Sequence, residues 1–215
     1  MSIENLMKKA ICLIDGFNIY HSLEDSKPNL SYPYKQYKWL NLKKLVEIFV
    51  KSQDQLNEIY YFTSYCTWDI AKVNRHKRYV YALKSEKIIP RIGRFKQVTK
   101  KCRADCKKKY ETNEEKRTDV DIATHLISLA YQGAYDHAYL MTADTDQIPA
   151  IEEVKKKFPN KKIFLIVPID SVAEDFRDSC DEIMKIREEH LKYSQFDLDI
   201  ITTEGKTISC PNEWR

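Results

Sequence analysis

The chain has 215 residues, of which 43% are hydrophobic and 32% charged. This is the mixture of a globular domain, and four glycines and seven prolines leave little sequence for long linkers or low-complexity tracts. The apolar run near the N-terminus, residues 9–15, is short and ends in an acid, which argues against a signal peptide and a membrane span. Six scattered cysteines are typical of reduced thiols rather than of a secreted disulfide framework. We therefore expect a cytoplasmic protein.

The net charge of +4 hides a strong asymmetry along the chain. Residues 75–109 contain fourteen Lys and Arg against two acids, a local charge of +12 that leaves −8 for the remainder. Such a distribution predicts a basic surface for a polyanion beside an acidic centre with a different task. The alternative is an ordinary solvated, lysine-rich face.

Strand and helix patterns alternate through the N-terminal half. The apolar run that ends at Asp15 is typical of a buried strand in a parallel sheet. Asn41 is suited to cap a following helix, and Pro90 places its strand near the sheet edge because proline has no N–H for a central ladder. In chain order we expect a strand at 9–15, helices at 17–24 and 41–50, a strand at 57–65, a helix at 69–85 and a strand at 87–95.

The C-terminal half begins with residues 96–117, the most polar stretch, which we expect to be a loop or loosely ordered insertion. Thr118 and Asp121 have the spacing of a capping box at the start of a helix that is apolar nearly all round and hence buried. We then expect a strand at 137–143, a helix at 145–158, a strand at 161–168, a helix at 171–180 and a strand or helix at 181–188.

This alternation predicts an α/β fold, a three-layer α/β/α sandwich with a mainly parallel central sheet. Residues 1–192 are expected to form one domain that includes the basic insertion, and residues 193–215 a peripheral C-terminal tail.

Acidic side chains follow two of the predicted strands. Asp15 ends the first strand, Asp144 and Asp146 follow the strand at 137–143, and Asp119 opens the buried helix. The carboxyl ends of parallel strands form the ligand crevice of such sheets, so these acids are expected to converge. The alternative for each acid alone is a helix cap, and this is the role expected for Asp121, which points to another face than Asp119.

Carboxylates gathered within a few ångströms repel one another unless a cation compensates their charge. Oxygen ligands select a hard ion, so we expect Mg²⁺ or Mn²⁺ at Asp15, Asp119 and Asp144, and not zinc. Such an ion can bind a phosphate oxygen and lower the pKa of a water. Asp15, Asp119, Asp144 and Asp146 are therefore the predicted catalytic residues.

The predicted substrate-binding residues are polar or basic. Asn18 and Thr142 lie beside the acids and are suited to orient a carboxylate or hold a phosphate, although local turn bonds are the alternative. The basic segment is suited to neutralise an RNA backbone, with Tyr79, Tyr81 and Phe95 as stacking surfaces for unpaired bases or simply as core. The basic residues expected to bind RNA are Arg75, Arg78, Arg91, Arg94, Lys100 and Lys101.

Cys102 and Cys106 form the one close cysteine pair. Their spacing is acceptable for half of a small zinc site, but the sequence offers no compact second half. Two free thiols on a basic loop are the favoured interpretation.

Three motifs resemble the NYN domain family, in its LabA-like branch of the PIN-like ribonucleases. They read LIDGFNIY, KRTDVDIATHLISLAY and AYLMTADTDQIPAI, and the resemblance covers residues 9–187. It implies a PIN-like fold and a metal-dependent endoribonuclease that leaves 5′-phosphate ends, with Asp15, Asn18, Asp119, Asp144 and Asp146 at the family's functional positions. The sequence departs from the family pattern at His125, Ala143 and Gln147, and His125 in place of an acid argues against a second metal.

The function expected from these features is cleavage of RNA, and single-stranded RNA is the expected substrate. A non-catalytic RNA-binding or scaffold protein that keeps the nuclease fold is the alternative, followed by an enzyme that acts on DNA or small phosphate esters. The possibility of a homodimer stays open at this point.

Overall fold

The structure is a computed structural model that describes residues 7–24, 34–101 and 109–215. Its centre is a six-stranded sheet in the order β3-β2-β1-β6-β7-β8, in which all neighbouring strands are parallel. The continuous apolar runs of the sequence occupy the middle of this sheet, and the strand with Pro90 lies at one edge, as expected. The strands are β1 Lys8–Asp15, β2 Asp54–Thr63, β3 Ile89–Ile92, β6 His137–Met141, β7 Lys162–Val167 and β8 Glu182–Lys185.

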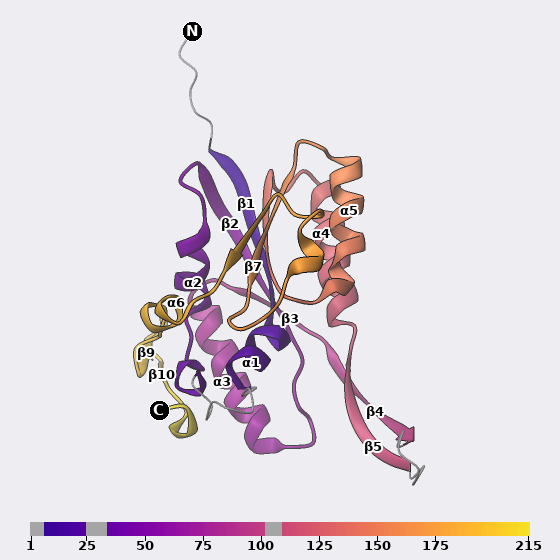
Figure 1. Cartoon of the computed structure of the whole chain (residues 1–215). Helices are drawn as coiled ribbons and strands as arrows, with labels where there is room; N and C mark the ends of the chain where they lie inside the picture. The colour runs from indigo at the N-terminus through magenta and orange to yellow at the C-terminus, as the bar shows by residue number, and fades with distance from the viewer. Residues whose placement is uncertain (1–6, 25–33, 102–108) are drawn as a thin grey trace.

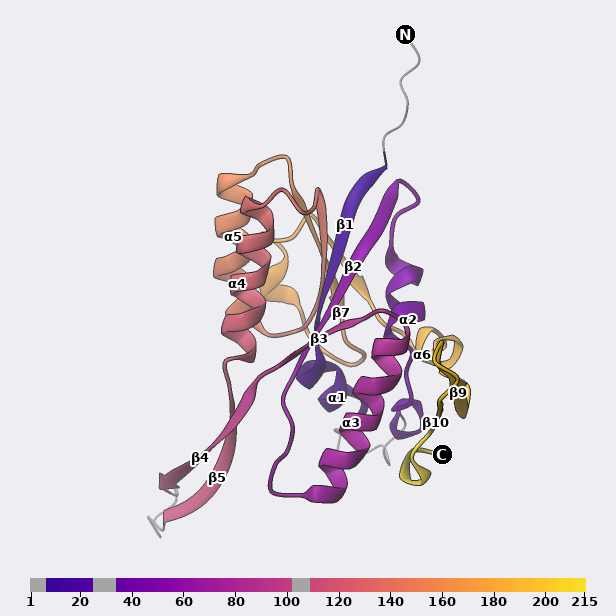
Figure 2. The same ribbon diagram turned by 180° about the vertical axis from the view of Figure 1, so that it is seen from behind.

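Helices cover both faces of the sheet, as Figures 1 and 2 show from opposite sides. One face is packed by α4, Thr118–Tyr131, and α5, Ile148–Lys157, and this layer has its own apolar cluster. The other face encloses a second cluster, on which three helices of the N-terminal half pack. These are α1 Gly16–Glu24, α2 Leu42–Phe49 and α3 Ile70–Ser85. The predicted three-layer α/β fold is confirmed.

One of the two predicted helix caps is wrong. Asn41 caps α2 as expected, because its Oδ1 accepts the amides of Lys43 and Lys44 at 3.0 and 3.1 Å. The capping box at Thr118 is absent: the cap position is Arg117, which has a left-handed backbone (φ 83°) and makes no side-chain cap bond. Thr118 is instead a buried residue of the helix, with its Oγ1 3.5 Å from Ser64 Oγ.

The described residues of the basic insertion form strands and not the expected loop. They form an antiparallel hairpin of β4, Arg94–Lys101, and β5, Lys109–Lys116, which projects from the body of the domain in Figure 1. In the backbone register Arg94 pairs with Lys116 at the base of the hairpin and Lys101 with Lys109 at the far end. The high polarity of the sequence concealed these strands, because it leaves no alternation of apolar and polar residues to detect.

The C-terminal segments also differ from expectation. Within 171–180 only Glu174–Phe176 is helical, as a 3₁₀ turn, and the ambiguous segment at 181–188 supplies edge strand β8 and the start of α6, Glu188–Tyr193. The expected peripheral tail contains the hairpin of β9, Asp199–Ile201, and β10, Thr207–Ser209.

The tail packs against the helix layer that contains α2 and α3. The Trp214 ring centroid lies 6.3 Å from that of Trp39 and 5.8 Å from that of Tyr79, and Ile208 and Cys210 are buried. These residues belong to the larger apolar cluster, so the tail completes one face of the core. Of the helices in the described ranges, none is both long enough and apolar enough to cross a membrane.

Candidate metal centre

Three of the four acids predicted to converge lie together at the carboxyl edge of the sheet. One carboxylate oxygen from each of Asp15, Asp119 and Asp144 lies within 4.8 Å of the other two. Asp15 is buried, Asp144 half-buried and Asp119 exposed, so the group opens to solvent on one side. We call these three residues the acidic cluster.

Sheet topology explains why residues so distant in sequence meet. Asp15 ends β1, and Asp144 follows the end of β6, the parallel neighbour of β1, so both lie at the same sheet edge. Asp119 is the second residue of α4. The fully buried Gln147 fixes this helix start, since its Nε2 donates to the Asp119 carbonyl at 3.2 Å.

The Asp15 carboxylate is held in one orientation by four donors. Its Oδ1 accepts the backbone amides of Phe17 and Asn18 at 3.1 and 3.0 Å. Its Oδ2 accepts Asn18 Nδ2 at 2.6 Å and Thr142 Oγ1 at 2.9 Å. These four hydrogen bonds fix the position of the Asp15 carboxylate before any ligand binds.

Asn18 and Thr142 also join the two loops that carry the acids. Asn18 Oδ1 accepts the Ala143 amide at 3.1 Å, and Thr142 Oγ1 accepts the Asp144 amide at 3.0 Å. Both side chains therefore orient the acidic cluster, one of the two roles considered for them. Their role as substrate ligands stays a prediction.

Gly16 is required at the turn between Asp15 and the rest of α1. A Cβ at this position would lie 2.5 Å from Tyr61 Cε2 and 2.7 Å from the Phe62 carbonyl oxygen. Because backbone cannot yield to such a contact as a flexible side chain can, the close approach of α1 to β2 demands glycine here.

Asp146 lies apart from the three clustered carboxylates. It is exposed in the 3₁₀ turn Thr145–Gln147, where its amide donates to Asp144 Oδ1 at 3.0 Å. The turn thus positions Asp144, and a catalytic role for the Asp146 carboxylate stays a prediction.

The donor set of the acidic cluster suits a hard divalent cation. Three carboxylates at this spacing carry a concentrated negative charge that a cation would relieve, and they offer only oxygen ligands. Mg²⁺ commonly uses few protein carboxylates and keeps open positions for water and phosphate. The arrangement therefore fits an ion that keeps open coordination positions on the solvent side.

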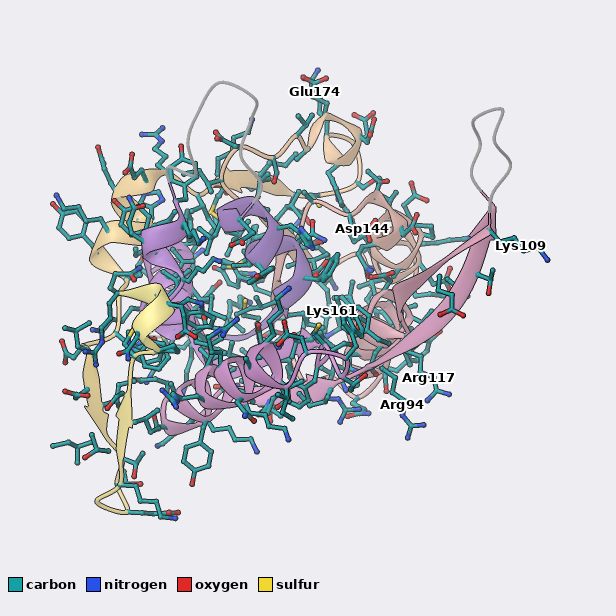
Figure 3. The ribbon with its side chains drawn as sticks, turned by 90° about the horizontal axis from the view of Figure 1, so that it is seen from below. Arg94, Lys109, Arg117, Asp144, Lys161 and Glu174 are labelled. Atoms are coloured by element: carbon teal, nitrogen blue, oxygen red, sulfur yellow. The ribbon has the colours of Figure 1, made fainter. Side chains whose placement is uncertain are left out.

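The predicted RNA-binding basic residues are spread over several elements. Arg75 Nη1 lies 2.8 Å from Glu213 Oε1, and Arg91 Nε lies 3.6 Å from Asp121 Oδ2, so an acid accompanies each of them. Arg78 is exposed on α3. Arg94 opens β4, and Figure 3 shows it beside Arg117 at the base of the hairpin, with Lys109 further out. For Lys100 and Lys101 the structure describes only the backbone, in β4.

The remaining candidates have mixed outcomes. Tyr79 is a core residue whose hydroxyl donates to the Leu40 carbonyl at 2.7 Å, whereas Tyr81 is exposed. His125 of α4 points toward β2, where its ring centroid lies 5.3 Å from that of Phe62. Its Nδ1 lies 2.9 Å from the carbonyl oxygen of Asp121, one turn earlier in the same helix. The expected cap at Asp121 is replaced by these contacts with His125 and Arg91. The possible zinc ligands Cys102 and Cys106 lie outside the described residues.

A cavity of about 500 Å³ beside the acidic cluster was not anticipated from the sequence. Its lining comes from α1, the end of β2, α3, the start of β4 and the C-terminal tail, and includes Phe17, Trp68, His76 and Phe95. The walls of the cavity come from distant parts of the chain, so no local sequence pattern predicts it. The one relevant signal in the sequence was the presence of aromatic residues in the basic segment.

His76 in the wall of this cavity makes the stability of the protein depend on pH. Burial lowers the pKa of His76 to about 4, below the ordinary value of 6.5. As the pH falls, His76 is therefore protonated in the unfolded chain before it is protonated in the folded protein. The folded state is favoured in full above about pH 6.5, and part of this stability is lost as the pH falls toward about 4. Between pH 6.5 and pH 4 the free energy of unfolding of wild type should fall by about 2–3 kcal/mol more than that of His76→Gln. Glutamine does not titrate in this range and can still form a hydrogen bond with Thr63. Urea unfolding at several pH values measures this difference, and identical pH slopes in the two proteins would contradict it.

The observations define a class of protein: a three-layer α/β domain with a carboxylate cluster at the carboxyl edge of a parallel sheet. The sequence model of the NYN domain matches residues 9–187, and the chain belongs to this family. NYN domains form a nuclease-like family that generally acts on RNA. Membership of the LabA-like branch stays a prediction.

Comparison with solved structures supports the fold. The crystal structure of a protein of unknown function from Vibrio parahaemolyticus matches with a TM-score of 0.56 and 14% sequence identity, covering 88% of this chain and 98% of that one. At this level of identity the likeness concerns the fold alone. No curated protein matches the chain.

Proposed function

We propose that this protein is a metal-dependent endoribonuclease that hydrolyses RNA at the acidic cluster. The observation that carries the proposal is the convergence of carboxylate oxygens from Asp15, Asp119 and Asp144 within 4.8 Å, on a fold whose family is nuclease-like. A purely structural role would not require three acids at an open sheet edge, where their mutual repulsion destabilises the domain.

In this proposal the acids hold Mg²⁺ or Mn²⁺, and Asp15 is the fixed anchor because four donors already define its position. Such an ion would supply positive charge to a phosphodiester and lower the pKa of an attacking water. Asp119 and Asp144, which are more exposed, lie on the solvent side where a phosphate arrives. The expected products carry 5′-phosphate and 3′-hydroxyl ends.

The basic residues of α3, β3 and the β4–β5 hairpin are proposed to bind the RNA backbone. Backbone neutralisation makes affinity fall as salt rises, and it is largely independent of sequence. Single-stranded RNA is the preferred substrate in this proposal, because an unpaired strand can follow the surface from the hairpin base to the acidic cluster.

Metal dependence is the direct test. Purified protein should cleave single-stranded RNA with Mg²⁺ or Mn²⁺, lose the activity with EDTA, and regain it when the metal is restored. DNA and small phosphate esters of the same phosphate concentration serve as competing substrates. Cleavage that persists in EDTA would contradict the proposal, and RNA binding without metal binding or cleavage would support the non-catalytic alternative.

A further inference from the structure

The cavity borders the acidic cluster, since Gly16, the residue after Asp15, is part of its lining. Phe17 lines the cavity, and its amide donates to Asp15 Oδ1 at 3.1 Å. On the other side, Ser64 lines the cavity and lies 3.5 Å from Thr118, the residue before Asp119. The lining of the cavity therefore reaches to within two residues of Asp15 and of Asp119.

The walls of the cavity are strongly aromatic. Phe17 and Tyr20 from α1 are partly exposed at it, and Trp68 is 52% exposed although it is one of the largest apolar side chains. The Trp68 ring meets Phe95 of β4 edge to face at 4.9 Å. Exposed aromatic rings around a hollow are unusual on a soluble surface and are suited to stack on a flat ring.

The charge of the lining is basic on balance. The lining contains four basic side chains and two glutamates. The basic residues are Lys35, Lys38, Lys72 and Arg75, and the glutamates are Glu24 and Glu213. Glu24 pairs with Lys38 and Glu213 with Arg75, which positions these two cations against the wall. Lys72 is more loosely held, with its Nζ 3.9 Å from Asp69 Oδ2. A planar, uncharged group with an attached anion matches this combination.

The volume is consistent with such a ligand, because about 500 Å³ falls within the range of pockets that enclose small molecules. We propose that this cavity receives one unpaired nucleotide of the RNA strand, with its base stacked among Phe17, Tyr20 and Trp68 and its phosphate near Lys72. The proposal rests on the proposed function and adds to it the feature of RNA that the protein reads: an extruded base beside the site of cleavage. It also accounts for the proposed preference for single-stranded RNA, since a base paired within a duplex cannot enter the cavity.

The test measures binding without cleavage, so that it can fail separately from the proposed function. All proteins carry Asp144→Asn, and the probe is a labelled short single-stranded RNA together with a series in which one nucleotide at a time is abasic. We expect one abasic position to weaken binding about tenfold when Trp68 is present. Trp68→Ala should weaken binding of the intact RNA by a similar factor and remove the sensitivity to that abasic position, as expected when two changes delete the same contact.

Two further variants make the result specific. Trp68→Phe keeps a stacking ring and should retain most of the affinity, while Tyr193→Ala removes an exposed aromatic ring on α6, away from the cavity, and should bind like the parent. Thermal unfolding of each variant checks that the fold is intact. The inference is overturned if Trp68→Ala binds all the RNAs as its parent does, or if no abasic position matters in the parent. Either result would leave the metal-dependent cleavage test unaffected and would favour a different ligand, such as a peptide, for the cavity.

Discussion

If the proposed function holds, Asp144→Asn is expected to reduce metal-dependent RNA cleavage about 10³-fold or more, because it removes one of the three carboxylates of the acidic cluster. Asparagine keeps a side-chain oxygen that can accept the Asp146 amide, so the 3₁₀ turn should remain folded. The loss should therefore appear in the single-turnover rate at saturating RNA, while thermal unfolding stays close to wild type. A calorimetric titration with Mn²⁺ should show weaker metal binding by the variant.

Matched controls separate this effect from a general loss of negative charge. Asp178→Asn makes the same chemical change at an exposed site and should leave the rate unchanged. Asp146→Asn asks whether this neighbouring acid, predicted from the sequence to be catalytic, takes part, since it does not belong to the acidic cluster. Cleavage by Asp144→Asn at the wild-type rate would eliminate the acidic cluster as the catalytic site.

Asp54→Ala is expected to cost about 3–5 kcal/mol of the free energy of unfolding, the largest stability effect among our predictions. The Asp54 side chain is fully buried at the start of β2. It lies 2.7 and 2.8 Å from His137 Nδ1 through its two oxygens, and Tyr139 donates its hydroxyl to Oδ2 at 2.6 Å. Alanine would leave two buried polar groups of β6, the His137 Nδ1 and the Tyr139 hydroxyl, without this partner.

Urea unfolding of wild type, Asp54→Ala and Asp54→Asn measures this cost. Asparagine retains one acceptor oxygen, so its loss should be clearly smaller than that of alanine. Because Asp54 lies at the opposite end of β2 from the residues that border the acidic cluster, folded Asp54→Ala should keep its cleavage rate, in contrast to Asp144→Asn. Equal stability of the alanine variant and wild type would show that the buried network contributes little.

The sequence by itself determined the central sheet and the acids that gather at its edge. Apolar runs identify β1, β6 and β7 because strands buried on both faces cannot tolerate polar residues. Parallel pairing then brings their carboxyl ends together whatever the details of packing, so Asp15 and Asp144 were predictable neighbours. The cap at Asn41 was also predictable, because its hydrogen bonds reach only two and three residues along the chain.

Only the tertiary structure decided the start of α4, the hairpin, the packing of the tail and the cavity. Thr118 has the sequence of a cap, but burial against Ser64 places it inside the helix. Trp214 reaches Trp39 and Tyr79 across long sequence separations, and the aromatic cavity needs α1, α3, β4 and the tail at once. Contacts of this kind depend on the relative placement of whole elements, for which local patterns carry no signal.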